Sequence, residues 1–165
     1  MEHLWAPWRA VYVGKNGKEN GATCIFCDKL HSAQDEANYL LYRGKKAFVL
    51  LNLYPYNNGH LLIAPKRHVG ELTGLTREEM SELAETSQAM VNLLKKAFHP
   101  DGFNIGANLG AVAGAGVPGH FHLHIVPRWT GDTNFMPVLG ETRVISEGLE
   151  VTYRKLKEVI MERAK

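Results

Sequence analysis

Three histidines alternate with apolar residues in the run His120-Phe121-His122-Leu123-His124. In a β-strand, residues two apart share one face and lie roughly 6.5–7 Å from each other, so these imidazoles would form a row about 13 Å long. Near neutral pH an imidazole can be a nucleophile, an acid, a base or a metal ligand. Three successive imidazoles on one face are improbable as a merely solvated surface, and we expect the row to act on one extended ligand.

Two kinds of chemistry fit such a row. Histidines two apart on a strand can hold a zinc ion with an open position for water. Alternatively, an imidazole can attack phosphorus and divide one displacement into two steps through a covalent intermediate. The preceding stretch favours phosphate, because its glycines let backbone N–H groups approach a phosphate closely; they are Gly106, Gly110, Gly114, Gly116 and Gly119. A mobile connector would be equally rich in glycine. The spacing of the histidines alone therefore permits both zinc binding and attack on phosphorus.

The only two cysteines, Cys24 and Cys27, have the spacing of half a tetrahedral zinc site. Two more ligands would have to come from elsewhere in the chain. A redox pair or two unpaired thiols would show the same spacing, so the pair alone permits all three interpretations.

Short strands and two helices must position these residues. Thr76 and Glu79 have the capping-box spacing, which predicts that a long amphipathic helix begins there, and the segment His99-Pro100-Asp101-Gly102 is expected to stop it. A second helix is predicted from about Leu149 to the C-terminus. Alternating or continuous apolar runs predict five strands, at Tyr39–Tyr42, Ala47–Leu51, His60–Ala64, Phe103–Ala107 and Phe121–Val126. This order of elements favours an α+β fold with an antiparallel sheet.

Length and composition predict one folded domain, 1–165, made of an N-terminal arm (1–23), a core (24–136) and a C-terminal extension with a helix (137–165). Trp5 and Trp8 are expected to anchor the arm by packing. Nineteen Lys and Arg against seventeen Asp and Glu give a charge of +2, too small for binding a nucleic-acid polymer. The sequence has neither a secretory signal nor a membrane-spanning apolar run, which predicts a cytoplasmic protein.

Two separated motifs resemble the histidine triad (HIT) family of nucleotide hydrolases and transferases. One runs from His120 to Arg128 and is preceded by Asn108 and the glycine-rich stretch; the other runs from Leu51 to Pro65. Together they cover roughly residues 39–130. The resemblance implies a HIT fold with an antiparallel sheet of about five strands, one long helix and a C-terminal helix. It also implies a homodimer whose sheet continues across both subunits.

The resemblance implies unequal roles for the triad. His122 would form a nucleotidyl-histidine intermediate, His124 would lie near the α-phosphate, and the His120 carbonyl would orient the His122 ring. The implied nucleotide-binding residues are Asn52, Asn108, Gly114, Gly116, His122 and His124, with Asn52 at the ribose. Asn108 stands where branches that prefer dinucleotides often carry Gln.

Zinc-bearing members of the superfamily complete the cysteine pair with a histidine after the third strand and with the first triad histidine. The matching residues here give a structural zinc site on Cys24, Cys27, His68 and His120, with His31 as the alternative to His68.

The segment from Arg128 to Met136 resembles the branch that acts on dinucleoside polyphosphates, which includes bacterial diadenosine tetraphosphate phosphorylases. The predicted function is therefore cleavage of a dinucleoside polyphosphate such as diadenosine tetraphosphate, with water or phosphate as acceptor. Two alternatives stay open: a nucleotide-binding module with negligible turnover, and a zinc-dependent hydrolase that uses the triad as metal ligands.

Overall fold

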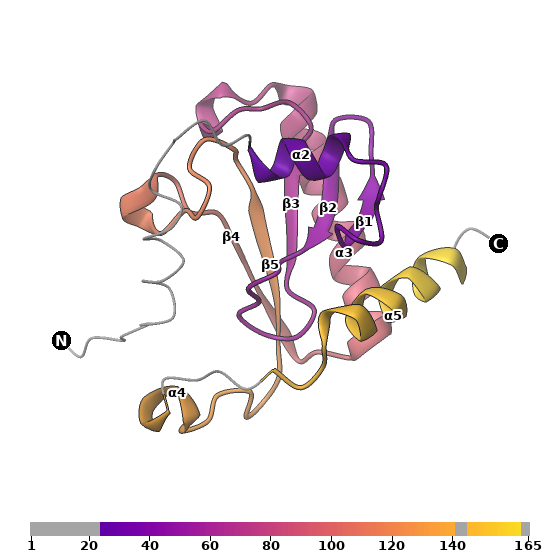
Figure 1. Ribbon diagram of the computed structural model, residues 1–165, viewed down its shortest axis with the longest axis vertical. Helices are drawn as coiled ribbons and strands as arrows, with labels where there is room; N and C mark the ends of the chain where they lie inside the picture. Colours follow the sequence, from indigo (N-terminus) through magenta and orange to yellow (C-terminus); the bar gives the residue numbers. More distant parts are fainter. Residues whose placement is uncertain (1–23, 141–144, 163–165) are drawn as a thin grey trace.

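The computed structural model describes residues 24–140 and 145–162, with no side-chain description at 137 and 138. The expected arm with Trp5 and Trp8 lies outside the described residues. Five antiparallel strands form one sheet in the order β1-β2-β3-β5-β4 (Figure 1). Their bounds are β1 Leu40–Arg43, β2 Ala47–Leu51, β3 Leu61–Pro65, β4 Gly102–Gly106 and β5 Leu123–Arg128.

Among the described residues, four α-helices accompany the sheet: α2 Ile25–His31, α3 Arg77–Phe98, α4 Met136–Leu139 and α5 Leu149–Glu162. Two 3₁₀ turns, η1 Leu72–Gly74 and η2 Ala111–Ala113, lie in the loops. The predicted α+β class, the five strands, the long helix and the C-terminal helix are confirmed. Within the described residues, no helix combines the length and hydropathy that crossing a membrane would require.

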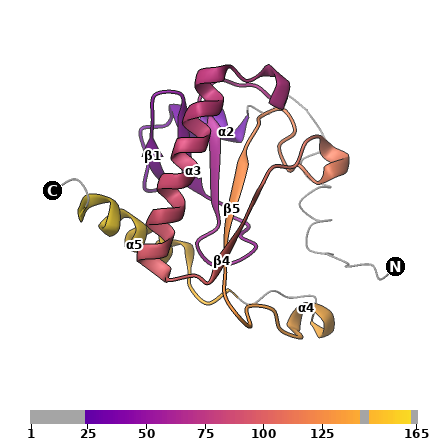
Figure 2. The same cartoon turned by 180° about the vertical axis from the view of Figure 1, so that it is seen from behind.

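Helices cover both faces of the sheet, which explains why every residue of β2 and β3 is buried. α3 and α5 pack on one face and α2 on the other (Figures 1 and 2). Because side chains alternate along a strand, Val49 and Ile63 join the core under α3, while Phe48 and Leu62 join the cluster under α2. His124 pairs with Leu62 and therefore belongs to the α2 face.

The predicted capping box is present at the start of α3. Thr76 accepts from the Glu79 backbone N–H at 3.2 Å, and the Glu79 carboxylate accepts from the Thr76 N–H at 2.8 Å. His99 ends the helix in the left-handed conformation. Sequence spacing therefore located both ends of this helix.

β5 begins two residues later than predicted, at Leu123 rather than Phe121, whereas β1 and β3 each begin one residue later than predicted. The Phe121 N–H donates to the Val69 carbonyl at 2.7 Å instead of joining the ladder with β3. Of the three histidines in the row, only His124 thus lies within β5, and the expected regular row on one strand is wrong in this respect.

Candidate active site and metal centre

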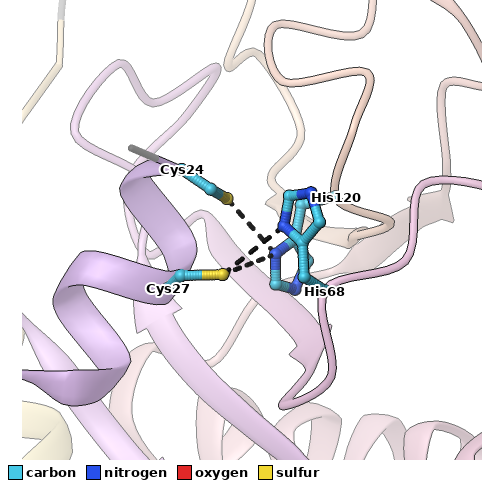
Figure 3. Close-up of side chains that lie close together, drawn as sticks. All are labelled: Cys24, Cys27, His68 and His120. Atoms are coloured by element: carbon cyan, nitrogen blue, oxygen red, sulfur yellow. Dashed lines mark hydrogen bonds between the residues drawn. The ribbon is translucent and has the colours of Figure 1, made fainter. Parts of the chain in front are cut away.

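Four potential metal ligands converge from three distant segments. Each of Cys24, Cys27, His68 and His120 offers one ligand atom, and these atoms all lie within 4.8 Å of one another (Figure 3). The Nδ1 atom of His120 lies 3.3 Å from Cys24 Sγ and 3.7 Å from Cys27 Sγ, and His68 Nδ1 lies 3.4 Å from Cys27 Sγ. Two thiols and two imidazoles form a donor set that suits a tetrahedral metal ion. These four residues could therefore hold a metal.

The ligand atom of His120 is fixed by its other nitrogen. His120 Nε2 lies 2.8 Å from the Pro65 carbonyl, which can only accept, so Nε2 carries the proton. Nδ1 is then a bare lone pair directed at the thiols. Burial raises the pKa of Cys27 to about 11, with a further contribution from its hydrogen bond with Cys24, and a cation would offset this cost by favouring the thiolate. The donor set fits a metal in chemistry as well as in position.

The segment that carries His68 is tied to the body from two sides. The Arg67 guanidinium donates to both carboxylate oxygens of buried Glu79, at 2.9 and 2.7 Å. On the other side, a Cβ on Gly70 would lie 2.6 Å from the Pro118 carbonyl, so the chain before His120 runs directly alongside. These contacts bring His68 and His120 together. Because they join residues distant in sequence, no local sequence pattern predicts them.

His122 lies next to this cluster and is 6% exposed. Its Nδ1 atom lies 2.8 Å from the His120 carbonyl, which again can only accept, so Nδ1 carries the proton and Nε2 the free lone pair. Burial lowers the pKa of His122, and the hydrogen bond to His120 opposes this only in part. At neutral pH this imidazole is therefore uncharged, with a nucleophilic Nε2 atom.

His124 is positioned by a fourth histidine, His60, which sequence reasoning did not assign to the site. The Tyr56 N–H donates to His60 Nδ1 at 3.0 Å, so neutral His60 carries its proton on Nε2. That proton faces His124 Nδ1 at 2.9 Å, and neutral His124 therefore carries its own proton on Nε2. The His122 and His124 rings lie 5.0 Å apart, close enough for one phosphate to contact both. The sequence signal for His60 was its position after Gly59 at the start of a buried strand.

The expected nucleotide-binding residues lie near this network. Asn52 donates from Nδ2 to His60 Nδ1 at 3.2 Å and accepts from the Tyr54 N–H at 3.0 Å. Asn108 follows β4, where Gly106 pairs with His124, and donates to the Gly114 carbonyl at 3.2 Å. Both asparagines thus stabilise loops beside the triad.

Two expected glycines lie in the loop after β4. Gly114 has φ 88°, a conformation that glycine adopts at no steric cost. Gly116, half-buried, lies two residues further along the same loop. The direction of the loop's N–H groups toward a phosphate stays a prediction.

The Arg128 side chain, at the end of β5, bonds to other protein groups. Its guanidinium donates to both oxygens of Asp132, at 2.6 and 2.7 Å, and to Asn104 Oδ1 at 2.7 Å. The ion pair holds the pKa of Asp132 well below its usual range. Arg128 therefore closes the loop after β5.

Comparisons with known proteins agree with this geometry. A family model described as HIT domain matches residues 33–131. The chain is 38% identical over 161 residues to the AP-4-A phosphorylase of Mycobacterium tuberculosis, a match that covers 94% of this chain and 83% of that protein.

Solved structures give the same relationship. A hypothetical histidine triad nucleotide-binding protein from Sulfolobus tokodaii superposes with a TM-score of 0.68 at 28% identity, covering 84% of this chain and 93% of that one. A Zn-bound histidine triad family protein from Mycobacterium smegmatis gives 0.62 at 24% identity over 97% of both chains, a likeness of fold.

Proposed function

The chain belongs to the HIT domain family, and from this premise we propose that it is an enzyme that cleaves dinucleoside polyphosphates at the α-phosphate through a covalent nucleotidyl-His122 intermediate. The observation that carries the proposal is the 2.8 Å hydrogen bond from His122 Nδ1 to the His120 carbonyl, which leaves Nε2 as the free lone pair. The 38% identical relative named AP-4-A phosphorylase points to diadenosine tetraphosphate as the substrate.

In the first step, His122 Nε2 forms a bond to the α-phosphorus and the bond from that phosphorus to the bridging oxygen breaks. With diadenosine tetraphosphate the products are adenylyl-His122 and ATP, whose terminal oxygen carries the electron pair away. The Nε2–H of His124 donates to the phosphate oxygens, because His60 holds the opposite nitrogen of that ring. Such donors act where charge develops and need no reorganisation during the reaction.

In the second step, an acceptor attacks the adenylyl group and His122 Nε2 departs with the electron pair of the broken P–N bond. Water as acceptor would give AMP, and inorganic phosphate would give ADP. We assign phosphate as the acceptor, which makes the enzyme a phosphorylase, because the match to the relative named AP-4-A phosphorylase covers 94% of this chain.

We further propose that the four-ligand cluster of Cys24, Cys27, His68 and His120 holds a structural Zn²⁺. Mixed thiolate and imidazole ligands favour zinc, and four protein ligands leave no open position for catalysis. Zinc there would link the segments that carry its ligands. Among the described residues, His122 and His124 belong to no group of three or more metal-ligating side chains, which argues against the triad as a catalytic zinc site.

Several further assignments complete the proposal. Asn52, Asn108, Gly114 and Gly116 would bind the nucleotide from the loops beside the triad. A homodimer would form by pairing β4, an edge strand of the sheet with Ile105 53% exposed, against its copy. The enzyme would act in the cytoplasm as one domain, 1–165.

The test is product identification with diadenosine tetraphosphate, with and without inorganic phosphate. Wild-type protein should give ADP and ATP when phosphate is present, and His122→Ala should give neither. His31→Ala removes an exposed histidine and should behave as wild type. Full activity in His122→Ala would overturn the covalent mechanism, AMP and ATP in the presence of phosphate would make the enzyme a hydrolase, and no turnover by the wild type would leave a nucleotide-binding module.

A further inference from the structure

Phe26 lies between the two cysteines on α2 and touches both sites. Its side chain is 1% exposed. Its ring centroid is 5.0 Å from the His120 ring, with a tilt of 40°, and 4.9 Å from the His122 ring, with a tilt of 36°. One aromatic ring therefore covers a residue of the four-ligand cluster and the proposed nucleophile together.

The imidazole of His122 needs such a contact to keep its direction. Its hydrogen bond from Nδ1 to the His120 carbonyl fixes one point of the ring and still permits the ring plane to tilt about that bond. A tilt would swing Nε2, the atom that must meet phosphorus in line. Phe26 packs against the ring and restricts this motion, and the His124 ring lies 5.0 Å away.

The position of Phe26 is set by the contacts that hold α2, and those of the four-ligand cluster are among them. α2 has seven residues, and Cys24 at its N-cap makes no side-chain capping bond. A helix this short is not stable by itself and is held by tertiary contacts. Those contacts include the burial of Phe26 and Leu30 and the hydrogen bond from the Arg43 guanidinium to the Leu30 carbonyl at 2.6 Å. At the N-terminal end of α2 they include the approach of both cysteines to the histidines.

We propose that Phe26 is a positioning residue for His122 and that it makes the direction of the nucleophile depend on the metal state of the four-ligand cluster. The role of His122 in this inference rests on the proposed function. α2 lies before residues 33–131, so the device stands outside the segment that the family model matches.

The test compares Phe26→Leu with the matched control Phe48→Leu. Phe48 is 0% exposed and belongs to the same cluster under α2, but its ring contacts are with Phe26, at 6.3 Å, and with His120, at 6.5 Å. Phe26→Leu should lower kcat about tenfold or more while KM changes by less than about threefold, since misplacement of a reacting group by about 1 Å can cost about 100-fold. Phe48→Leu should lose comparable thermal stability yet keep kcat within about threefold.

A second readout needs no substrate. In protein with isotope-labelled histidine, the imidazole resonances of His122 should shift or broaden in Phe26→Leu and keep their positions in Phe48→Leu. Chelation of zinc should move the same resonances in the wild type, and move them less in Phe26→Leu. If the Leu variant does not fold, Phe26→Met fills the space with a flexible side chain and no ring.

Unchanged kcat and unchanged His122 resonances in Phe26→Leu would overturn the proposal, as would equal losses in both variants. Resonances that stay in place after zinc is removed would overturn its dependence on the metal. If the wild type cleaves no nucleotide, the proposed function fails, while the resonance comparison still decides whether Phe26 positions the ring.

Discussion

The two ends of the histidine row are built from the same residue type at the same spacing, yet their surroundings differ. At the His120 end, one ring nitrogen faces a carbonyl and the other faces two thiols, so both are committed to the protein. At the other end, His60 Nε2 donates to Nδ1 of His124. The proton of neutral His124 is therefore on Nε2, on the opposite side of the ring from His60. His122 lies between them with its Nδ1 atom bound to a carbonyl.

The hydrogen-bond partner of each imidazole therefore sets its chemistry. A carbonyl forces a proton onto the nitrogen it faces and leaves a lone pair on the other. A histidine that donates its own proton does the reverse and leaves a donor on the far side. In the proposed mechanism, three identical side chains thus serve as a ligand, a nucleophile and a hydrogen-bond donor.

The largest expected effect separates His122 from His120. His122→Ala should lower kcat by at least about 10⁴-fold, because loss of a covalent nucleophile leaves only binding and electrostatic contributions. Its zinc content should equal that of the wild type. His120→Ala should instead lose zinc, as measured by elemental analysis. Equal loss of zinc in both variants would contradict the assignment of His120 as a zinc ligand and His122 as a residue that binds no zinc.

The next effect concerns metal affinity. Cys27→Ser should weaken zinc binding by about 100-fold or more, beyond the 10–100-fold typical of residues that only support a ligand. A competition titration with a chromogenic chelator measures it, and His31→Ala is the matched control on the same helix. Should the serine variant bind zinc as tightly as the control, the four-ligand assignment would be wrong.

At the other end, His60→Phe should lower kcat by about 100-fold, within the range for a misdirected proton donor. Tyr56→Leu keeps the backbone N–H that orients His60 and should cost less. Zinc content should stay at the wild-type level in both. An equal loss of kcat in the two variants would mean that the ring contacts of Tyr56 with the two histidines matter more than the proton on His124.

A smaller effect is expected from pH. Burial lowers the pKa of His122 below its ordinary value of 6.5, so the folded imidazole stays neutral as the pH falls through 6.5. The acid limb of kcat/KM should therefore have its midpoint below pH 6.5. In the unfolded chain the same group takes up its proton near 6.5, so its contribution to stability is present above that pH and is lost as the pH falls toward the folded pKa. A midpoint above 6.5 would contradict the assignment of His122 as a buried neutral nucleophile.

The smallest effect on activity is expected where α5 contacts the loop between β2 and β3. Thr152 of α5 donates to Asn58 Oδ1 at 3.1 Å, and both residues are buried. Thr152→Val leaves that oxygen unsatisfied and should cost about 1–3 kcal/mol of unfolding free energy, with kcat within about threefold. A single unfolding transition, shifted as a whole, would support the proposed unit in which core and extension unfold together.

Patterns local in the chain predicted most of the fold. The capping box of Thr76 and Glu79 and the continuous apolar runs of β2 and β3 depend on neighbouring residues alone. The start of β5 was missed because the Phe121 N–H bonds to Val69, a residue fifty-two positions away. Sequence periodicity cannot predict a distant carbonyl that competes with the neighbouring strand for this N–H group.

The site, like the fold, has residues that the sequence predicted and residues that it did not. The family resemblance brought together Cys24, Cys27, His68 and His120, and the structure places their ligand atoms within 4.8 Å of one another. His60 was missed because its role depends on the Tyr56 N–H that sets its tautomer. Phe26 looked like an ordinary core residue, since its contact with two histidines about a hundred positions away exists only in the folded chain.

In the proposed mechanism, His122 carries the nucleotide during turnover. The direct measurement is the intact mass of protein quenched in alkali during turnover of diadenosine tetraphosphate, followed by peptide mapping. We expect a mass increase of one adenylyl group, located on His122, that is labile to acid as a P–N bond should be and is absent from His122→Ala. A protein that turns over with an adduct on another residue, or with none in single-turnover samples, would contradict the account.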